Sequence, residues 1–121
     1  MVKINSINPV KIRITFKSPQ VVGYVINIED NDLNAIEKYV GDSKNNNWKD
    51  IDLTSSPTML NGNFIQGFFS IADPVGKGNK ILFTIEVFQD GKSIFSSDLS
   101  GTSTGEIDRL NIREQFNTIM P

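Results

Sequence analysis

The amino-acid sequence predicts an all-β fold: an antiparallel β-sandwich formed by a single domain over residues 1–121. Short runs of alternating apolar and polar residues recur along the chain, which is the period of half-buried strands. Turn signals rich in Pro, Gly, Asn and Ser separate these runs at spacings of about ten residues, as in all-β domains. Helical spacing is rare, and the 38% apolar fraction suits a globular chain with one core.

The first two strands are expected at residues 10–17 and 21–29, where apolar side chains occupy every second position. The break between them, Ser18-Pro19-Gln20, is short and suits a tight reversal. The sequence therefore predicts that these two strands form an antiparallel hairpin.

Residues 30–56 are the least periodic part of the chain. Leu33, Ile36 and Val40 have near-helical spacing, but residues 35–42, AIEKYVGD, also form a strand pattern ended by Gly41. We favour the strand, and we expect brief pairing by residues 50–53, DIDL.

Two later segments carry apolar side chains on both faces. Residues 63–71 follow the turn signal Asn61-Gly62, and residues 81–95 form a hairpin around Asp90-Gly91, which favours a type I′ turn because both central residues need positive φ. A two-residue loop places Val87 opposite Ile94 and puts Phe88 and Phe95 diagonally together on the other face.

Something must cover these two aromatic side chains, since monomers rarely expose such a patch. One possibility is the chain's own C-terminal segment, which carries Leu110, Ile112 and Phe116. The other is a protein or subunit interface centred on Phe88 and Phe95, together with Phe68.

Residues 106–117 are ambiguous. Leu110, Ile112 and Phe116 fit strand alternation with one fault at Glu114, whereas Glu106 after Thr104-Gly105 suits a helix start. The sequence is therefore compatible with a strand or with a short C-terminal helix.

Composition argues against several functions. The chain has no histidine and no cysteine, and it lacks a glycine-rich phosphate loop, so most catalytic nucleophiles and metal sites are excluded. Asp50 and Asp52 could form a carboxylate pair for glycoside hydrolysis, but we expect solvated acids and no enzyme. A net charge of −2 disfavours nucleic acid, although Lys11, Arg13 and Lys17 would form a stripe that either meets an acidic partner or protects an edge strand.

We expect a soluble protein of undetermined compartment. The sequence has no apolar run long enough to span a membrane, and its first ten residues lack the apolar core of an export signal.

Two loops could bind ligands. Asp30 and Asp32 have the spacing of the first ligands of a calcium loop, but Ala35 stands where such a loop needs glycine. The sequence therefore allows only a looser calcium site, and we expect no other cofactor. Trp48 follows Asn45, Asn46 and Asn47, a combination that could stack on and hydrogen-bond to a sugar, unless the ring plugs one end of the core.

The succession of short strands and turns resembles that of bacterial immunoglobulin-like modules, although the chain has no Cys…Trp…Cys framework. This resemblance implies an immunoglobulin-like or fibronectin-like sandwich. We therefore predict a non-enzymatic binding or assembly module acting through protein–protein contacts, with another protein or a second copy as partner. The alternative is a lectin-like carbohydrate-binding module, with calcium as an optional aid.

Overall fold

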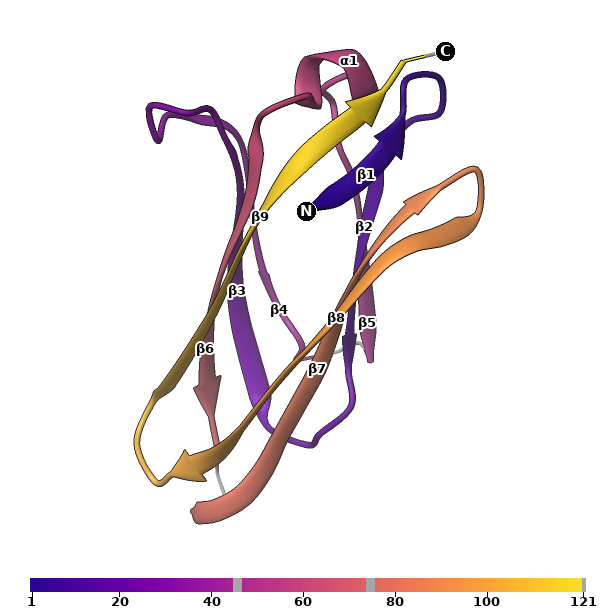
Figure 1. Ribbon diagram of the computed structural model, residues 1–121. Coiled ribbons are helices and arrows are strands. Elements are labelled where there is room, and N and C mark those ends of the chain that lie inside the picture. The colour runs from indigo at the N-terminus through magenta and orange to yellow at the C-terminus, as the bar shows by residue number, and fades with distance from the viewer. Residues whose placement is uncertain (45–46, 74–75, 121) are drawn as a thin grey trace.

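The structure, a computed structural model, describes residues 1–44, 47–73 and 76–120. The described residues form nine strands and one short helix, shown in Figure 1. In chain order these are β1 (Val2–Asn5), β2 (Lys11–Phe16), β3 (Val21–Glu29), β4 (Ala35–Asp42), β5 (Trp48–Asp52), α1 (Pro57–Leu60), β6 (Phe64–Ala72), β7 (Lys77–Gln89), β8 (Lys92–Thr104) and β9 (Asp108–Ile119).

The strands form two sheets, one of five strands in the order β1-β9-β6-β3-β4 and one of four strands in the order β5-β2-β7-β8. Neighbouring strands are antiparallel except β1 and β9, which are parallel. The expectation of a purely antiparallel fold is therefore wrong at this edge. Strands so far apart in the sequence need no hairpin turn, so their direction is not constrained by a short connection.

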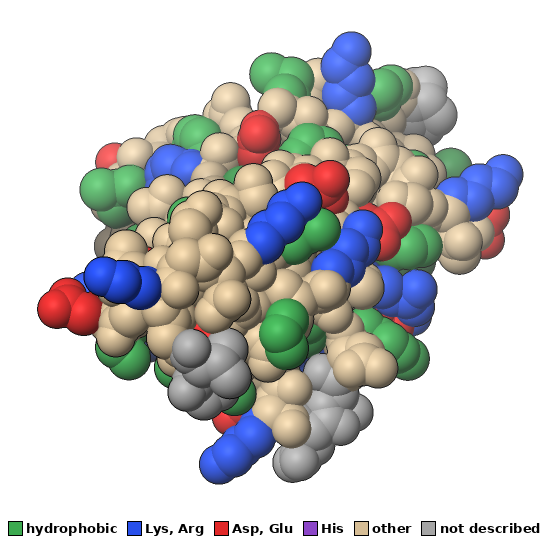
Figure 2. Space-filling model, turned by 90° about the horizontal axis from the view of Figure 1, so that it is seen from below, with side chains coloured by type: hydrophobic (Ala, Val, Ile, Leu, Met, Phe, Trp, Pro, Cys, Tyr) green, Lys and Arg blue, Asp and Glu red, His purple; other side chains and the backbone are tan. Residues whose placement is uncertain are grey.

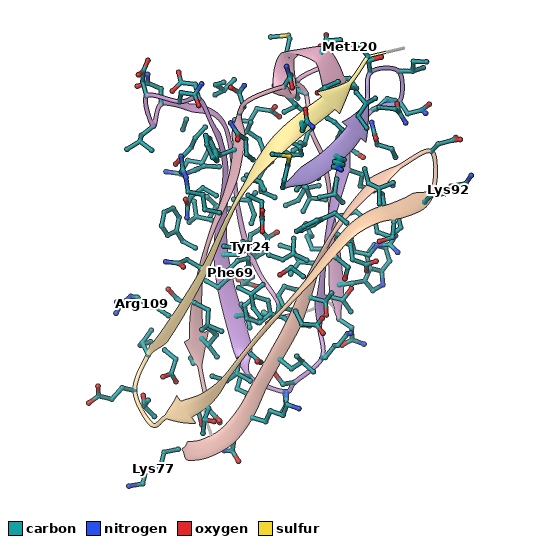
Figure 3. All side chains as sticks on the ribbon, viewed as in Figure 1. Tyr24, Phe69, Lys77, Lys92, Arg109 and Met120 are labelled. Carbon is teal, nitrogen blue, oxygen red and sulfur yellow. The ribbon has the colours of Figure 1, made fainter. Side chains whose placement is uncertain are left out.

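The core lies between the inner faces of the two sheets. Alternation along each strand places one apolar set there, and the rings of Phe69 and Phe83 meet with centroids 4.6 Å apart. Tyr24 and Phe69 both lie in this interior (Figure 3). The core is therefore continuous across the interface between the two sheets.

The predicted hairpin between the first two strands does not form, although both strands lie where the sequence placed them. β2 pairs with β5 and β7, whereas β3 pairs with β4 and β6 in the other sheet. The connecting segment crosses between sheets and is anchored to β7, since the Lys17 amide donates to the Leu82 carbonyl (3.0 Å) and the Leu82 amide donates to Ser18 Oγ (2.9 Å). The short segment Ser18-Pro19-Gln20 therefore connects strands of different sheets and does not form a hairpin within one sheet.

The β7–β8 hairpin has the expected turn, with Asp90 at φ 52° and Gly91 at φ 70°. Its register shifts beyond the second pair: Val87 lies opposite Phe95 rather than opposite Ile94. This β-bulge adds one residue to β8, and because strand side chains alternate, Phe95 moves to the core side. The predicted diagonal contact between Phe88 and Phe95 is therefore wrong.

The C-terminal segment is the strand β9 and contains no helix. Its one break in alternation, Glu114, is accommodated because the carboxylate accepts a hydrogen bond from the Met1 amino group (2.6 Å). The short helix is α1 instead, where Ser56 caps the first turn by accepting from the Met59 amide and Pro57 begins the helix. Residues 35–42 form the expected strand, and the brief pairing expected at residues 50–53 begins earlier, at Trp48.

Single polar side chains hold the two sheets together at both open sides. On one side, the buried carboxylate of Glu37 in β4 accepts hydrogen bonds from the Thr54 amide (2.7 Å), the Ser55 amide (3.0 Å), and the Ser55 and Tyr39 hydroxyls, just after β5. On the other side, Gln89 at the end of β7 exchanges hydrogen bonds with the backbone of Asn5 in β1. The first of these contacts fixes the end of β5, which carries part of the site described below.

Within residues 1–44, 47–73 and 76–120, no helix has the length and apolar character needed to cross a membrane.

Candidate ligand-binding face

Four side chains gather on the outer face of the four-stranded sheet: Arg13, Trp48, Asp50 and Phe88, called here the Arg13 cluster. Arg13 comes from the central strand β2, and its cross-strand partner on β5 is Asp50. The two aromatic residues lie diagonally to it, Trp48 on β5 and Phe88 on β7. The pleat therefore brings three strands' outward side chains to one place.

Arg13 is held from three directions. Its Nε donates to Asp50 Oδ1 (2.7 Å) and its Nη2 donates to Oδ2 (3.0 Å), a bidentate pair. The guanidinium carbon lies 4.8 Å from the ring centroid of Trp48 and 4.8 Å from that of Phe88. The hydrogen bond from Arg13 lowers the pKa of Asp50, and the same bond raises the pKa of Arg13.

The contact between Arg13 and Asp50 determines the protonation of one member of the carboxylate pair considered for catalysis, Asp50 and Asp52. A general acid in glycoside hydrolysis needs a raised pKa so that it stays protonated near neutral pH. The pKa of Asp50 is lowered by Arg13, so this side chain stays ionised. Asp50 therefore serves as an anchor for Arg13 and as a hydrogen-bond acceptor.

Trp48 does not plug the end of the core, since 52% of its surface is exposed. Asn47 is also exposed, and its carbonyl accepts from the Phe16 amide (2.8 Å), which fixes the backbone just before the ring. Asn45 and Asn46, the other two amides of the predicted glycan site, lie outside the described residues. The structure thus leaves an indole surface open to solvent, with its neighbour Arg13 fixed.

Two shallow hollows flank the cluster. One, of about 450 Å³, is lined by Lys11, Trp48, Lys49, Asp50 and Asp52. The other, of about 270 Å³, lies toward the β7–β8 turn and is lined by Pro9, Val10, Lys11, Arg13, Asp52, Phe88, Asp90 and Gly91. Lys11 and Asp52 line both hollows, so the two are contiguous across β2.

The structure contradicts one of the two roles expected for the cationic stripe, the protection of an edge strand. β2 lies between β5 and β7, so Lys11 and Arg13 are not on an edge strand and do not protect one. Lys11 lies 3.7 Å from the Asp50 carboxylate, while Lys17 lies beyond the end of the strand. The charges of Lys11 and Arg13 are both close to the Asp50 carboxylate on the adjacent strand β5.

The three phenylalanines proposed as one protein interface do not share a surface. Phe88 lies half-buried on the outer face of the four-stranded sheet, and Phe95 packs against the core. Phe68 lies on the outer face of the opposite sheet, where 47% of its surface is exposed. The predicted cover of Phe88 by the C-terminal segment is also absent, because Phe116 faces the core. Arg13 covers the Phe88 ring instead.

The five-stranded sheet has its own arginine–carboxylate pair over an aromatic ring. Arg113 Nη1 donates to Glu29 Oε1 (2.6 Å), and its guanidinium carbon lies 4.1 Å from the Phe64 ring centroid. Phe68 forms a transverse row with Val25, its cross-strand partner, and with Val40, the partner of Val25 on β4.

A third hollow, of about 360 Å³, lies at the opening between β1 and β8. Ile94, the bulged residue, lines it together with Ile7, Ile119 and Met120, and Lys3 is its one charged lining residue among those described. Few polar groups are available there to orient a small polar ligand. Seen from below in Figure 2, hydrophobic side chains lie in separate small patches between polar and charged groups.

In the loop predicted to bind calcium, the Asp30 carboxylate accepts hydrogen bonds from its own loop. Asp30 Oδ1 accepts hydrogen bonds from the amides of Asp32 (2.9 Å) and Asn34 (3.0 Å), and its Oδ2 accepts from Asn34 Nδ2 (3.2 Å). These donors, above all the Asn34 amide, lower the pKa of Asp30. Among the described residues, no group of three or more acidic side chains could hold a metal ion, so the spacing forms a hydrogen-bonded turn.

Comparison with known proteins extends the description of the fold. No protein-family model and no curated protein matches the chain. The structure is similar to a crystal structure of a DUF4425 family protein from Bacteroides ovatus, with a TM-score of 0.56 and 9% identity over 88% of this chain and 94% of that chain. It is also similar to a domain of unknown function, DUF4425, from Bacteroides vulgatus, with a TM-score of 0.54 and 11% identity over 89% of this chain and 95% of that chain. At these identities the likeness shows a shared β-rich fold of two sheets.

Proposed function

We propose that this chain is a non-catalytic carbohydrate-binding module whose ligand lies on the outer face of the four-stranded sheet. The observation that carries the proposal is the exposed indole of Trp48 beside a fixed Arg13. A flat apolar ring presents a suitable surface to the C–H groups of a sugar, while nearby charged groups accept and donate hydrogen bonds to its hydroxyls.

Preorganisation strengthens this proposal. Ordering a side chain on binding costs about 0.5–1.5 kcal/mol for a rotamer-rich residue. Here Arg13 is already held by two hydrogen bonds and two ring contacts, and it stacks against Trp48. Much of that ordering cost is therefore met during folding.

Binding to immobilised neutral glycans tests the proposal. We expect the wild-type protein to bind one or more members of a glycan array, Trp48→Ala to lose that binding at least tenfold, and Phe68→Ala to retain it. Phe68 is the matched control because it is an exposed aromatic residue of the opposite sheet. Glycan binding that survives Trp48→Ala, or the absence of any binding, would refute the proposal.

The immunoglobulin-like character of the sandwich belongs to the same proposal. Two facing sheets and strands joined across the core support it. The order β1-β9-β6-β3-β4, with β1 parallel to β9, differs from the constant-type order of an immunoglobulin domain. We therefore propose an immunoglobulin-like sandwich that is a variant in strand order.

A second candidate function is protein contact through the row formed by Phe68, Val25 and Val40. Val40 is 69% exposed and Phe68 is 47% exposed, so the row could be the centre of an interface with another protein or a second copy. Sedimentation of the wild-type protein and of Phe68→Ser tests self-association. A concentration-dependent dimer that Phe68→Ser dissociates would support it, and a monomer at all concentrations would exclude the second copy.

A further inference from the structure

Resting on the proposed function, we infer that the site takes a neutral oligosaccharide of at least two sugar units, lying across β5, β2 and β7, and not a monosaccharide or an acidic glycan. This inference identifies the ligand class. It depends on the two contiguous hollows, on the ring at each of them, and on the balance of charge around them.

The geometry sets the minimum length. Neighbouring strands in a sheet are about 4.8 Å apart, so β5 and β7 are separated by about 10 Å across β2. Trp48 lies at the hollow on the β5 side and Phe88 at the hollow on the β7 side. The Arg13 guanidinium lies between the two rings, 4.8 Å from each centroid, and so separates a sugar unit on the exposed part of Trp48 from Phe88. Contact with both rings therefore takes a chain of two or three units.

The two hollows also differ in what they offer. The larger one has the more exposed ring, Trp48, and is the stronger stacking site. The smaller one has half-buried Phe88 and the open, Cβ-free surface of Gly91, which allows a ligand to approach the turn closely. The first unit is therefore bound mainly at Trp48, and a second or third unit adds contacts at Phe88.

The charges around the hollows favour a neutral ligand. Their lining includes equal numbers of cations and carboxylates, namely Lys11, Arg13 and Lys49 against Asp50, Asp52 and Asp90. Asp50 already satisfies Arg13 through two hydrogen bonds. An acidic sugar would gain from the lysines and lose to Asp52 and Asp90, whereas hydroxyl groups can use both kinds of partner.

A length series tests the inference. Glucose, mannose and xylose ladders of one to six units, with oligogalacturonides as acidic probes, are titrated by calorimetry and by protein-observed nuclear magnetic resonance. The variants are Trp48→Ala, Phe88→Leu, and Phe68→Leu as the same change on the opposite sheet. Phe88→Leu keeps an apolar side chain beneath Arg13 but removes the ring. Thermal unfolding checks that each variant is folded.

We expect affinity in at least one neutral ladder to rise at least tenfold between one and three units. Phe88→Leu should remove most of that gain while changing the monosaccharide affinity less than twofold, and Phe68→Leu should change neither. Equal affinity for one and three units, or a gain that survives Phe88→Leu, would overturn the inference and leave Trp48-dependent binding intact. Oligogalacturonides binding more tightly than every neutral ladder would overturn the charge argument. If no ladder binds, or binding survives Trp48→Ala, the proposed function fails as well.

Discussion

The carboxylate of Glu37 gives a quantitative test of the folded structure. Burial of this group would by itself raise its pKa, but hydrogen bonds from the Ser55 and Tyr39 hydroxyls and from the Thr54 and Ser55 amides outweigh burial and lower it from 4.5 to about 2. Since each pKa unit corresponds to about 1.36 kcal/mol, ionised Glu37 stabilises the fold by ~3 kcal/mol relative to the protonated form.

The direction of the pH dependence follows from the lowered pKa. The unfolded chain takes up a proton at Glu37 near pH 4.5, whereas the folded chain resists protonation until about pH 2. The stabilisation is therefore complete well above pH 4.5 and is lost as pH falls through that range, to about 1.4 kcal/mol at pH 3.

Replacement of Glu37 by Gln removes the charge while keeping the shape. Urea unfolding at pH 7, 5, 4 and 3 gives the free energy of unfolding of each protein. We expect Glu37→Gln to cost about 2–3 kcal/mol at pH 7, or roughly 8–12 °C in Tm for a domain of this size, and less than half of that at pH 3. Glu106→Gln, the same change at an exposed position, should cost less than about 0.5 kcal/mol throughout. A cost for Glu37→Gln that is below 0.5 kcal/mol at pH 7, or that stays constant down to pH 3, would refute the reasoning.

Two pairs of substitutions test how the five-stranded sheet packs on the core. Phe69→Ala removes a buried ring packed on Phe83 and should lower the free energy of unfolding in urea by about 3–5 kcal/mol. Phe68→Ala, at the exposed neighbouring position, should lower it by less than about 1 kcal/mol. Similar losses for the two variants would show that the assignment of inner and outer faces on β6 is wrong. Gly67→Ala puts its new Cβ 2.8 Å from the Phe69 ring and should cost about 1–3 kcal/mol. Gly23→Ala, with its nearest atom at 3.9 Å, should be neutral or stabilise by up to about 1 kcal/mol, and equal effects of the two would contradict the packing.

Local pattern predicted the strands more reliably than their partners. The alternation at residues 10–17 and 21–29 identified β2 and β3, because a half-buried strand imposes a period of two on its own residues. The same pattern contains no information about which sheet a strand joins, so the expected hairpin was wrong. β1 is only four residues long, too short for its alternation to stand out, and it was not predicted.

The β7–β8 hairpin shows how one residue limits prediction. The turn at Asp90-Gly91 follows from residue type, and it was predicted correctly. The bulge at Ile94 has no such local signal, yet it reverses the face of every later residue in β8. The predicted contact between Phe88 and Phe95 was wrong for this reason.

The candidate site was predicted in pieces. Residue type identified Trp48 as a possible platform for a sugar, and Arg13 was noted as part of a cationic stripe. Nothing in the sequence indicated that the two side chains are in contact. Their contact depends on β2 pairing with β5, with Arg13 opposite Asp50 although the two are 37 residues apart. Such long-range pairing is decided by the packing of the whole core rather than by local pattern.

The most direct test of the account is the fluorescence of Trp48, since it is the only tryptophan in the chain. Its emission and its quenching by acrylamide are measured with and without neutral glucose, mannose and xylose oligosaccharides. The account predicts that a bound oligosaccharide shifts the emission to shorter wavelength and protects the indole from the quencher. A glycan that binds the protein but leaves both emission and quenching unchanged would contradict it.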